Sequence, residues 1–426
     1  MSRYKPYPTY KNSCVEWLGQ VPEHWIISKV KWEFEARLGK MLQPAQNNDS
    51  EVEVPYHKAV SVQWEIVASE APETMWGSSK DIETYQIRCG DLLICEGGEV
   101  GRAAIFKEDV SEPLIIQNSL HRVRPKNDNL NEVLLRIMQT VHSARWFEVL
   151  CSKATIVHFT GEKLGDLAFP VAPINEQKAI VAYLERETAR IDALVNAKTR
   201  FIELLREKRQ ALITHAVTKG LDPNVKMKDS GVKWLGQVPE HWLCIPLKWR
   251  TRCKSGISIG VEDINSDADN LNDIPVIGGN GLLGFARNSN VVDSVLAIGR
   301  VGALCGNVHI INTPAWITDN ALILDITTKD FDINYLAAIL KTRNLNSLAS
   351  KSAQPLITGT LVGEQMVAIP PIDEQIEIIE FLTRKTTIID ALINKTVRSI
   401  ELLKERRATL ITAAVTGQID LREVEE

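Results

Sequence analysis

One nine-residue sequence occurs twice in this chain of 426 residues. Residues 17–25 and residues 234–242 both read Trp-Leu-Gly-Gln-Val-Pro-Glu-His-Trp. A longer block also repeats, because 27 of the 52 positions aligned between 171–222 and 369–420 are identical. The first block recurs after 217 residues and the second after 198, so the segments between them differ in length. This arrangement predicts one frame, present twice, that carries two divergent inserts and suits an asymmetric target with two parts.

The longer repeated block predicts two long helices. Its apolar residues step by four and three, the spacing of a heptad seam, and no Pro or Gly interrupts either run before Gly220 or Gly417. Asn175 and Asp373 suit the N-cap position. We expect two helices of about 40 residues, each roughly 60 Å long, packed as an antiparallel coiled coil that holds the inserts apart. Two independent surface helices are the alternative. The seam residues are Leu184, Thr188, Ile191, Val195, Lys198, Ile202, Leu205, Arg209 and Leu212, with Leu382, Thr386, Ile389, Ile393, Thr396, Ile400, Leu403, Arg407 and Leu410.

The segments between the repeats, which we name the first insert (28–170) and the second insert (245–369), predict mixed strands and turns. Short apolar runs end in glycine turns, as strands do. Several motifs match between the inserts and predict the same fold in both: Asp91–Cys95 with Val295–Ile298, Val100–Ala103 with Val301–Ala303, Gln117–Leu120 with Asp319–Leu322, Ser152-Lys153 with Ser350-Lys351, and Phe159–Gly161 with Ile357–Gly359.

The predicted fold class is therefore α/β (α+β), with a pseudo-twofold internal repeat. Two domains of mixed strand and helix are separated by the two long helices. The predicted division is 1–170 for the first lead-in and first insert, 171–222 for the first helical segment, 223–369 for the second lead-in and second insert, and 370–426 for the second helical segment.

Composition limits the possible functions. The hydrophobic fraction of 44% and charged fraction of 24% are those of an ordinary soluble protein. No apolar run approaches the roughly 20 residues of a membrane span, and the N-terminus lacks a signal peptide, so we expect a cytoplasmic protein without membrane contact. Seven cysteines without a C-x-x-C pair indicate reduced thiols and no metal site. The net charge of -5 does not advertise nucleic-acid binding.

No catalytic constellation is present in the sequence, and we expect neither catalytic residues nor a cofactor. The glycine-rich stretches 97–101 and 278–281 lack the spacing of a phosphate-binding loop, and tight turns between strands explain them better. His24 and His241 each follow a glutamate, a pair that could perform acid–base chemistry. The flanking tryptophans favour instead an aromatic packing unit in both copies.

Residues able to form paired hydrogen bonds with base edges would be the useful ones for reading nucleic acid. Such residues lie on the variable, turn-rich parts of both inserts, although any one of them alone is more often a solvated surface residue. The candidates are Arg102, Gln117, Asn118, His121, Arg122, Arg124 and Lys153 in the first insert, and Asn280, Arg287, Arg300, Asn307, His309, Lys351 and Gln354 in the second.

Together these motifs resemble the specificity subunit of type I restriction–modification systems over nearly the whole chain. The resemblance rests on the duplicated sequence of 17–25 and on Pro371-Ile-Asp-Glu-Gln375 with its counterpart Pro173–Gln177. It also rests on Leu212–Thr218 with Leu410–Thr416. Two further elements, Asp91–Gly98 and Ile298–Gly302, look like parts of that family's target recognition domains.

The resemblance implies a DNA-reading subunit without catalytic activity. Two target recognition domains would each read one half of a split target in double-stranded DNA, and the paired helices would set the gap. Two modification subunits carrying S-adenosylmethionine would dock and methylate adenine, and motor–nuclease restriction subunits would add cleavage. The modification subunits could supply much of the phosphate clamp, which would explain the acidic balance. A protein–protein scaffold, an inactive specificity subunit and an enzyme acting on a small molecule are the alternatives.

Overall fold

The structure is a computed structural model that describes residues 5–69, 73–151, 158–350 and 355–422. Contacts divide the chain into two compact units, one made of 1–198 with 398–426 and the other of 199–397. Each unit contains a lead-in, one insert, and a part of both long helices. The segment boundaries at 170, 222 and 369 stay a prediction, since this division follows contacts instead of repeats.

The first unit is built around two sheets. The four-stranded sheet has the order β10-β9-β12-β4 and is antiparallel throughout. The three-stranded sheet has the order β11-β5-β8, with β11 parallel to β5. The strands of these sheets are β4 (Phe34–Leu38), β5 (Val52–His57), β8 (Glu73–Gly77), β9 (Leu92–Cys95), β10 (Ala103–Ile105), β11 (Ile115–Ile116) and β12 (Leu120–Pro125). Three two-stranded ribbons pair β1 (Tyr10–Asn12) with β2 (Gln20–Pro22), β3 (Ile26–Lys29) with β13 (Ala168–Val171), and β6 (Val62–Gln63) with β7 (Ile66–Val67).

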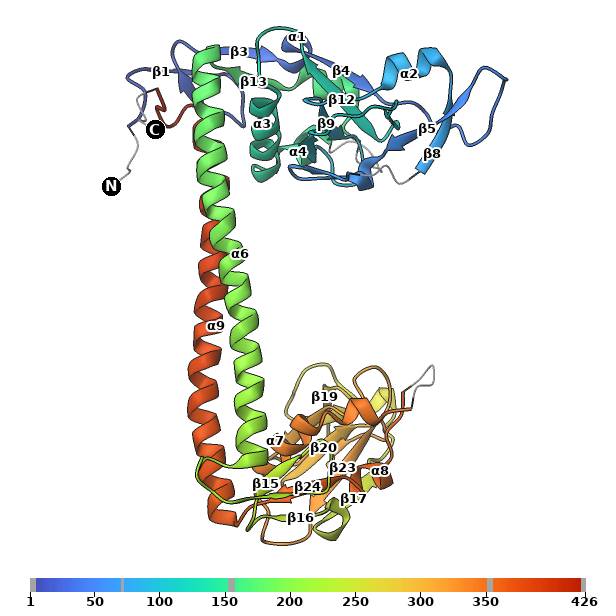
Figure 1. The fold of residues 1–426 in the computed structure, drawn as a ribbon, viewed down its shortest axis with the longest axis vertical. Coiled ribbons are helices and arrows are strands. Elements are labelled where there is room, and N and C mark those ends of the chain that lie inside the picture. Colours follow the sequence, from blue (N-terminus) through green and yellow to red (C-terminus); the bar gives the residue numbers. More distant parts are fainter. Residues whose placement is uncertain (1–4, 70–72, 152–157, 351–354, 423–426) are drawn as a thin grey trace. The chain divides into compact units, whose positions relative to one another are not determined.

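Helices cover one face of the four-stranded sheet in the first unit. Helix α3 (Asn131–Ser143) lies against β10 and β12, and α4 (Trp146–Cys151) packs on α3 (Figure 1). The core between them is apolar and includes Leu92 and Ile94. The opposite face of the sheet buries Leu93 against Ile116 of the smaller sheet. The remaining helices of the insert are short: α1 (Val30–Glu33), α2 (Ser79–Tyr85), α5 (Gly161–Asp166) and the 3-10 helix η1 (Ala59–Ser61).

The second unit repeats this architecture. Its sheets have the orders β17-β23-β20-β21 and β19-β18-β22, with β22 parallel to β18. Helix α7 (Ile333–Arg343) lies against β20 and β21. The strands are β14 (Met227–Asp229), β15 (Gln237–Pro239), β16 (Leu243–Pro246), β17 (Thr251–Ser255), β18 (Ile274–Gly278), β19 (Gly281–Ala286), β20 (Val295–Gly299), β21 (Val308–Ile311), β22 (Trp316–Ile317), β23 (Ala321–Ile326) and β24 (Met366–Ile369). The short helices are η2 (Leu247–Trp249), η3 (Val261–Asp263), η4 (Leu345–Leu348) and α8 (Gly359–Gly363).

The inserts thus share one fold, as predicted, but two of the predicted matches between them are wrong. Leu120 lies opposite Cys95, and Ala321 lies opposite Gly299 in the same place. Residues 117–120 therefore correspond to 318–321, one residue earlier than the sequence match. Because a slip of one residue turns every side chain of a strand to the other face, this shift changes which side chains are comparable.

The second wrong match concerns the glycine turn between β9 and β10 in the first insert and between β20 and β21 in the second. The amide of Gly101 donates to the carbonyl of Cys95, and the amide of Gly306 donates to that of Gly299. Gly101 therefore corresponds to Gly306 and not to Gly302. Both glycines have positive φ, and an added Cβ would collide with Phe147 or Asn346 respectively. Arg102 consequently corresponds to Asn307.

The two long helices confirm the predicted coiled coil. Helix α6 spans Ile174–Lys219 and α9 spans Ile372–Val415. Every residue of the predicted seam is buried or half-buried. In the first unit the guanidinium of Arg407 pairs with Asp192, and in the second that of Arg209 pairs with Asp390. The beginning of each helix therefore packs beside the end of the other, which makes the pair antiparallel.

The helix ends agree with the prediction and the helix starts do not. Gly220 and Gly417 follow the two helices with positive φ, as C-terminal caps do. Asn175 and Asp373 lie inside the first turn instead of at the N-cap, because the amides of Gln177 and Gln375 already donate to the carbonyls of Pro173 and Pro371.

The repeated Pro-Glu-His-Trp sequence has a structural role in both units. In the first, Glu176 at the start of α6 accepts hydrogen bonds from Trp25 Nε1 and Tyr7 Oη, both 2.9 Å long, and lies 2.7 Å from His24 Nε2. In the second, Glu374 binds His241 and Trp242 at 2.8 and 3.1 Å. We name each arrangement a glutamate lock, and it joins a lead-in to the start of a long helix.

The structure also describes the glycine-rich stretches and the cysteines. The glycine-rich stretches 97–101 and 278–281 form turns between neighbouring strands, as expected. All seven cysteines lie in the described residues, and each is a free thiol. Among the described residues, no helix has the length and apolarity that crossing a membrane requires.

Candidate nucleic-acid interface

Loops gather at one end of the four-stranded sheet in the first insert. Residues 96–102, 117–119 and η1 meet there, and we name this region the first loop end. The hydroxyl of Ser119 accepts from the amide of Ala59, 3.0 Å away. The amide of Glu96 donates to the carbonyl of Ser119, and the amide of Phe159 donates to that of Glu96. Backbone hydrogen bonds therefore hold the loops in fixed positions while their side chains vary.

The second insert has an equivalent second loop end, made of 279–281, 300–307 and 318–320. The amide of Arg300 donates to the carbonyl of Asn320, and the amide of Ile357 donates to that of Arg300. These bonds repeat those of Glu96, so Arg300 and Glu96 occupy the same position with opposite charges. The same backbone scaffold thus presents different chemistry in the two inserts.

Several predicted residues lie at these loop ends. In the first, Gln117 accepts from the Ser119 hydroxyl at 2.5 Å, and Asn118 is half-buried. In the second, Asn280 is exposed, and its Oδ1 accepts from the side-chain Nδ2 of Asn307 at 3.5 Å. Carboxamides here could present a donor and an acceptor to a base. The structure brings these four residues to equivalent regions of the two inserts.

The two arginines at the loop ends are partly used inside the protein. Arg102 Nη2 donates to the carbonyl of Ala59 at 2.9 Å and Nη1 pairs with Glu99. Arg300 Nη1 donates to Ser255 Oγ at 3.1 Å. Both guanidinium groups therefore form hydrogen bonds or ion pairs within the insert, which help to hold the loops. The predicted residues Lys153, Lys351 and Gln354 lie outside the described residues.

Of the two histidines among the predicted DNA-binding residues, one is buried and the other is half-buried. His121 on β12 is fully buried, its Nε2 is 2.9 Å from the carbonyl of Phe159, and burial lowers the pKa of the imidazole. His309 on β21 is half-buried, and burial, with Lys341 nearby, lowers its pKa as well. His121 therefore has no exposed surface with which to reach a base.

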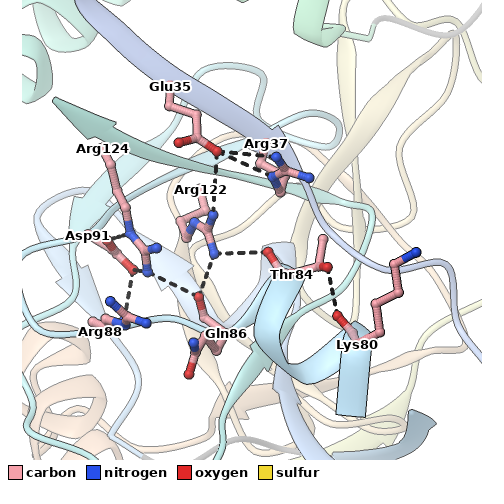
Figure 2. Close-up of polar contacts among 9 residues, drawn as sticks. All are labelled: Glu35, Arg37, Lys80, Thr84, Gln86, Arg88, Asp91, Arg122 and Arg124. Atoms are coloured by element: carbon pink, nitrogen blue, oxygen red, sulfur yellow. Dashed lines mark hydrogen bonds and ion pairs between the residues drawn. The ribbon is translucent and has the colours of Figure 1, made fainter. Parts of the chain in front are cut away.

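Arg122 and Arg124 on β12 have structural partners (Figure 2). The side chain of Arg122 is buried, and its Nη1 donates to the carbonyls of Thr84 and Gln86 at 3.1 and 2.7 Å. Since those carbonyls end helix α2, Arg122 acts as a cap for the helix. Arg124 forms a two-pronged ion pair with Asp91, with distances of 2.6 and 2.7 Å. Neither arginine is therefore free to read bases.

Figure 2 also shows cations that the sequence prediction missed. Arg37 on β4 lies directly opposite Arg122 in the sheet and is exposed, with a weak contact of 3.3 Å to Glu35. Arg88 precedes β9 and its side chain is exposed. The sequence signal for Arg37 was alternation along β4, which places every second side chain on one face.

Arg287, the last predicted residue, lies apart from the second loop end. It follows β19 and lines a pocket of about 400 Å³ with Asn265, Asn272, Asn288 and Trp316. The side chain is exposed. The predicted residues of the second insert therefore do not form one surface. Within the described residues, no cluster of three or more His, Cys, Asp or Glu side chains could hold a metal ion.

Comparison with known proteins identifies the family. The model of the type I restriction modification DNA specificity domain matches residues 22–204 and 263–402. The chain belongs to this family. The two matches fall on the two inserts and their adjoining helices, so the specificity domain is present twice, and the predicted family resemblance is confirmed.

Known relatives agree with this assignment. The EcoprrI specificity subunit of Escherichia coli is 30% identical over 141 residues, which cover 33% of this chain and 35% of that subunit. The EcoBI specificity subunit of Escherichia coli is 23% identical over 368 residues, 79% of this chain and 75% of that protein. The chain thus spans about a third of the first relative's length and three quarters of the second's.

Two solved structures share the fold. One, from a study of complex assembly and conformational transition of the type I R-M system, has a TM-score of 0.74 at 15% identity and covers 94% of this chain and 99% of its own. The HsdS subunit from Thermoanaerobacter tengcongensis has a TM-score of 0.56 at 15% identity, with 94% and 98% covered. These similarities confirm the predicted fold class.

Proposed function

We propose that this chain is the DNA-reading subunit of a type I restriction–modification complex. Each insert acts as a target recognition domain that reads one half of a split, asymmetric target in double-stranded DNA. The observation that carries the proposal is the double match of the DNA specificity domain to two inserts of equal topology. A duplicated reader with divergent contact residues suits two unlike half-sites.

The loop ends supply the divergence that such reading needs. Gln117 and Thr318 occupy the same position, as do Asn118 with Asp319 and Arg102 with Asn307, by the strand register. The last two pairs differ in the donors and acceptors that they can offer to base edges in the major groove, whereas the buried Thr318 leaves its position without an exposed polar group in the second insert. The proposed base-reading residues in the described part of the chain are Arg102, Gln117, Asn118, Asn280, Arg287, Arg300, Asn307 and His309.

The same proposal assigns the chemistry to partners. Two modification subunits, which bind S-adenosylmethionine, methylate adenine, and motor–nuclease subunits add cleavage in the cytoplasm. This chain acts as a reader and scaffold without catalytic residues of its own. Exposed apolar residues on the long helices support docking of two like partners, since Leu194 and Leu204 on α6 recur as Leu392 and Leu402 on α9. A partner helix packed on each copy would bury them.

A protein–protein scaffold without DNA binding is the second candidate, supported by the acidic net charge. The family model favours DNA, because it describes a DNA specificity domain. A specificity subunit that no longer reads DNA is the third candidate, and one experiment separates both alternatives from the DNA-reading subunit.

Adenine-methylation mapping across a whole genome tests the proposed function. The chain is co-expressed with the modification subunit of its own system, and cells without the chain are the control. We expect one split motif that is methylated only when the chain is present. A stable complex without a new motif would contradict DNA reading and favour an inactive specificity subunit or the scaffold.

The proposed role of the helix pair in setting the gap has its own test. Seven residues inserted into both helices, beside Ala197 and Lys395, preserve the heptad seam and add roughly 10 Å. The gap of the mapped motif should grow by about three base pairs at 3.4 Å each. An unchanged gap with both half-sites intact would show that the helices do not set it.

A further inference from the structure

The edge strands of the two large sheets share one feature that the divergent loops do not. β4 and β17 each lie at the edge of a four-stranded sheet. Arg37 lies opposite Arg122 in the first, and Lys254 lies opposite Ile323 in the second, which is the same position by register. Both side chains are exposed. A cation is thus present at one place on both inserts.

In the first insert this cation belongs to a larger group, the arginine cluster of Arg37, Arg88, Arg122 and Arg124 (Figure 2). Two carboxylates face four guanidinium groups, and one of them, Asp91, is taken up by Arg124. Arg122 is buried beside Arg124, and both burial and its neighbour lower its pKa. The first insert as a whole carries more Asp and Glu than Lys and Arg, whereas this cluster carries more guanidinium groups than carboxylates.

The residues that surround the edge cation differ in the second insert. Register places Val295, Ile323 and Asp325 where the first insert has Asp91, Arg122 and Arg124. The buried Arg122 is therefore replaced by Ile323, which belongs to the core, and the half-buried Arg124 by the carboxylate Asp325, which lies opposite Arg252. At the position of Glu35, however, the second insert has an exposed arginine, Arg252. Its edge strand thus presents two cations without the carboxylate.

We propose that the edge strands β4 and β17 are contact surfaces for DNA backbone phosphates, with Arg37 and Lys254 as the paired contact residues. The inference rests on the proposed function and adds to it a set of contacts separate from base reading. Phosphate contacts fix a protein's position on the duplex and carry no sequence information directly. A contact of this kind can stay the same while the loops that read the two half-sites diverge.

The strand geometry connects these surfaces with the loop ends. β4 continues into Gly39 and Lys40, and the carbonyl of Lys40 accepts from the amide of Asn118 at 2.9 Å. β17 continues into Gly256 and Ile257 in the same way, and the amide of Ile257 donates to the carbonyl of Ile317. Each edge cation is therefore two residues from the segment that is bonded to a loop end.

A different role for these cations makes an opposite prediction. Charged side chains on an edge strand also prevent it from pairing with strands of other molecules. Removal of the charge would then promote aggregation and leave DNA affinity per folded molecule unchanged. The salt dependence of DNA binding separates the two roles, because it counts the phosphates that are neutralised.

The test uses the complex of the full chain with its modification subunits and a duplex that contains the mapped motif. The dissociation constant is measured across a salt series for wild type, Arg37→Ala, Lys254→Ala and the double variant. Lys226→Ala is the matched control, since Lys226 is an exposed cation in a lead-in, paired with Glu240 at 3.0 Å. Each edge variant should lower the salt slope by about 0.9 and weaken binding about fivefold at physiological salt.

Glu35→Gln provides a test of opposite sign. Glu35 is an exposed carboxylate beside Arg37 and opposes a nearby phosphate, so its neutralisation should tighten binding without a change in motif. The proposal is overturned if both edge variants keep the slope of wild type and Lys226→Ala, whether or not they aggregate. If wild type itself shows no preference for the motif duplex, the proposed function fails, and that result is distinct from failure of the phosphate contacts alone.

Discussion

The two inserts share one attachment to the frame and differ in others. Gln177 of α6 accepts from the amide of Leu130, and Gln375 of α9 accepts from the amide of Asp332 in the equivalent place. In the first unit, Glu65 in the turn between β6 and β7 binds Arg136 and Gln139 of α3, and Arg407 of α9 donates to it at 2.6 Å. The corresponding helix residue in the second unit, Arg209, pairs with Asp390, and no described residue of the second insert forms an ion pair with it.

The second insert is attached through Tyr335 of α7 instead. The tyrosine hydroxyl lies 3.0 Å from the carbonyl of Val217 on α6 and 3.0 Å from that of Ala368. The glutamate locks, by contrast, are present in both units. The comparison indicates that the repeated motifs maintain the frame and one attachment of each insert, while Glu65 and Tyr335 provide attachments that differ between the units.

The shared locks should give the largest effects. Glu176→Ala leaves Trp25 Nε1 and the Tyr7 hydroxyl without their acceptor, and burial of those donors predicts a loss of about 3 kcal/mol in unfolding free energy. Glu374→Ala removes two contacts instead of three and should cost about 2 kcal/mol. Hydrogen exchange in each unit measures both losses. Equal protection in both variants and wild type would show that the locks do not stabilise the frame.

The ionic attachment should be specific to the first unit. Arg407→Ala removes the contact with Glu65 and should cost about 2 kcal/mol, whereas Arg209→Ala breaks only a partly exposed pair and should cost less than about 1 kcal/mol. Unfolding of the two variants under the same conditions makes the comparison. Equal losses would mean that the attachment of the first insert does not depend on Glu65.

The pH dependence of this attachment follows from Glu65. Burial raises the pKa of its carboxyl, but Arg136 and Arg407 more than offset this, and the pKa is lowered overall. A carboxylate with a lowered folded pKa stabilises the protein above its ordinary pKa of 4.5 and loses that contribution as the pH falls through the folded value. Glu65→Gln should therefore be less stable than wild type at pH 7, and the difference should shrink below pH 4.5. A difference independent of pH would contradict the ionic account.

The hydroxyl attachment of the second insert should give the smallest effect. Tyr335→Phe keeps the buried ring and removes only the hydrogen-bond donor, which predicts a loss of about 1 kcal/mol. Hydrogen exchange of α7 and the end of α6 provides the measurement. Unchanged protection at Val217 would show that packing alone holds the second insert.

Much of the frame could be predicted from the sequence, because a heptad seam and an exact repeat are local signals. Helix α6 ends at Lys219, directly before Gly220, and α9 ends at Val415, two residues before Gly417. The seam residues are buried or half-buried along both helices. Their starts were predicted two residues late, since acceptors such as the Pro173 carbonyl come from the backbone and leave no mark on residue type.

The contact residues were harder to predict because burial depends on partners far away in the chain. Arg122 resembles a base-reading arginine in sequence, yet it caps α2 through carbonyls 36 and 38 residues away. Arg37 resembles any charged residue of an alternating strand, and only the edge position of β4 makes it notable. The correspondence of Arg102 with Asn307 could likewise be found only from the hydrogen-bond register. The loop from β9 to β10 that contains Arg102 and the loop from β20 to β21 that contains Asn307 differ in length.

The central claim is that the two inserts read independently, and domain exchange tests it most directly. Residues 28–170 are replaced by the first insert of another specificity subunit with a known target, and the methylated motif is mapped with the frame and second insert unchanged. The account predicts that one half-site takes the donor's sequence while the other half-site stays the same. A motif that changes in both halves, or in neither, would contradict it.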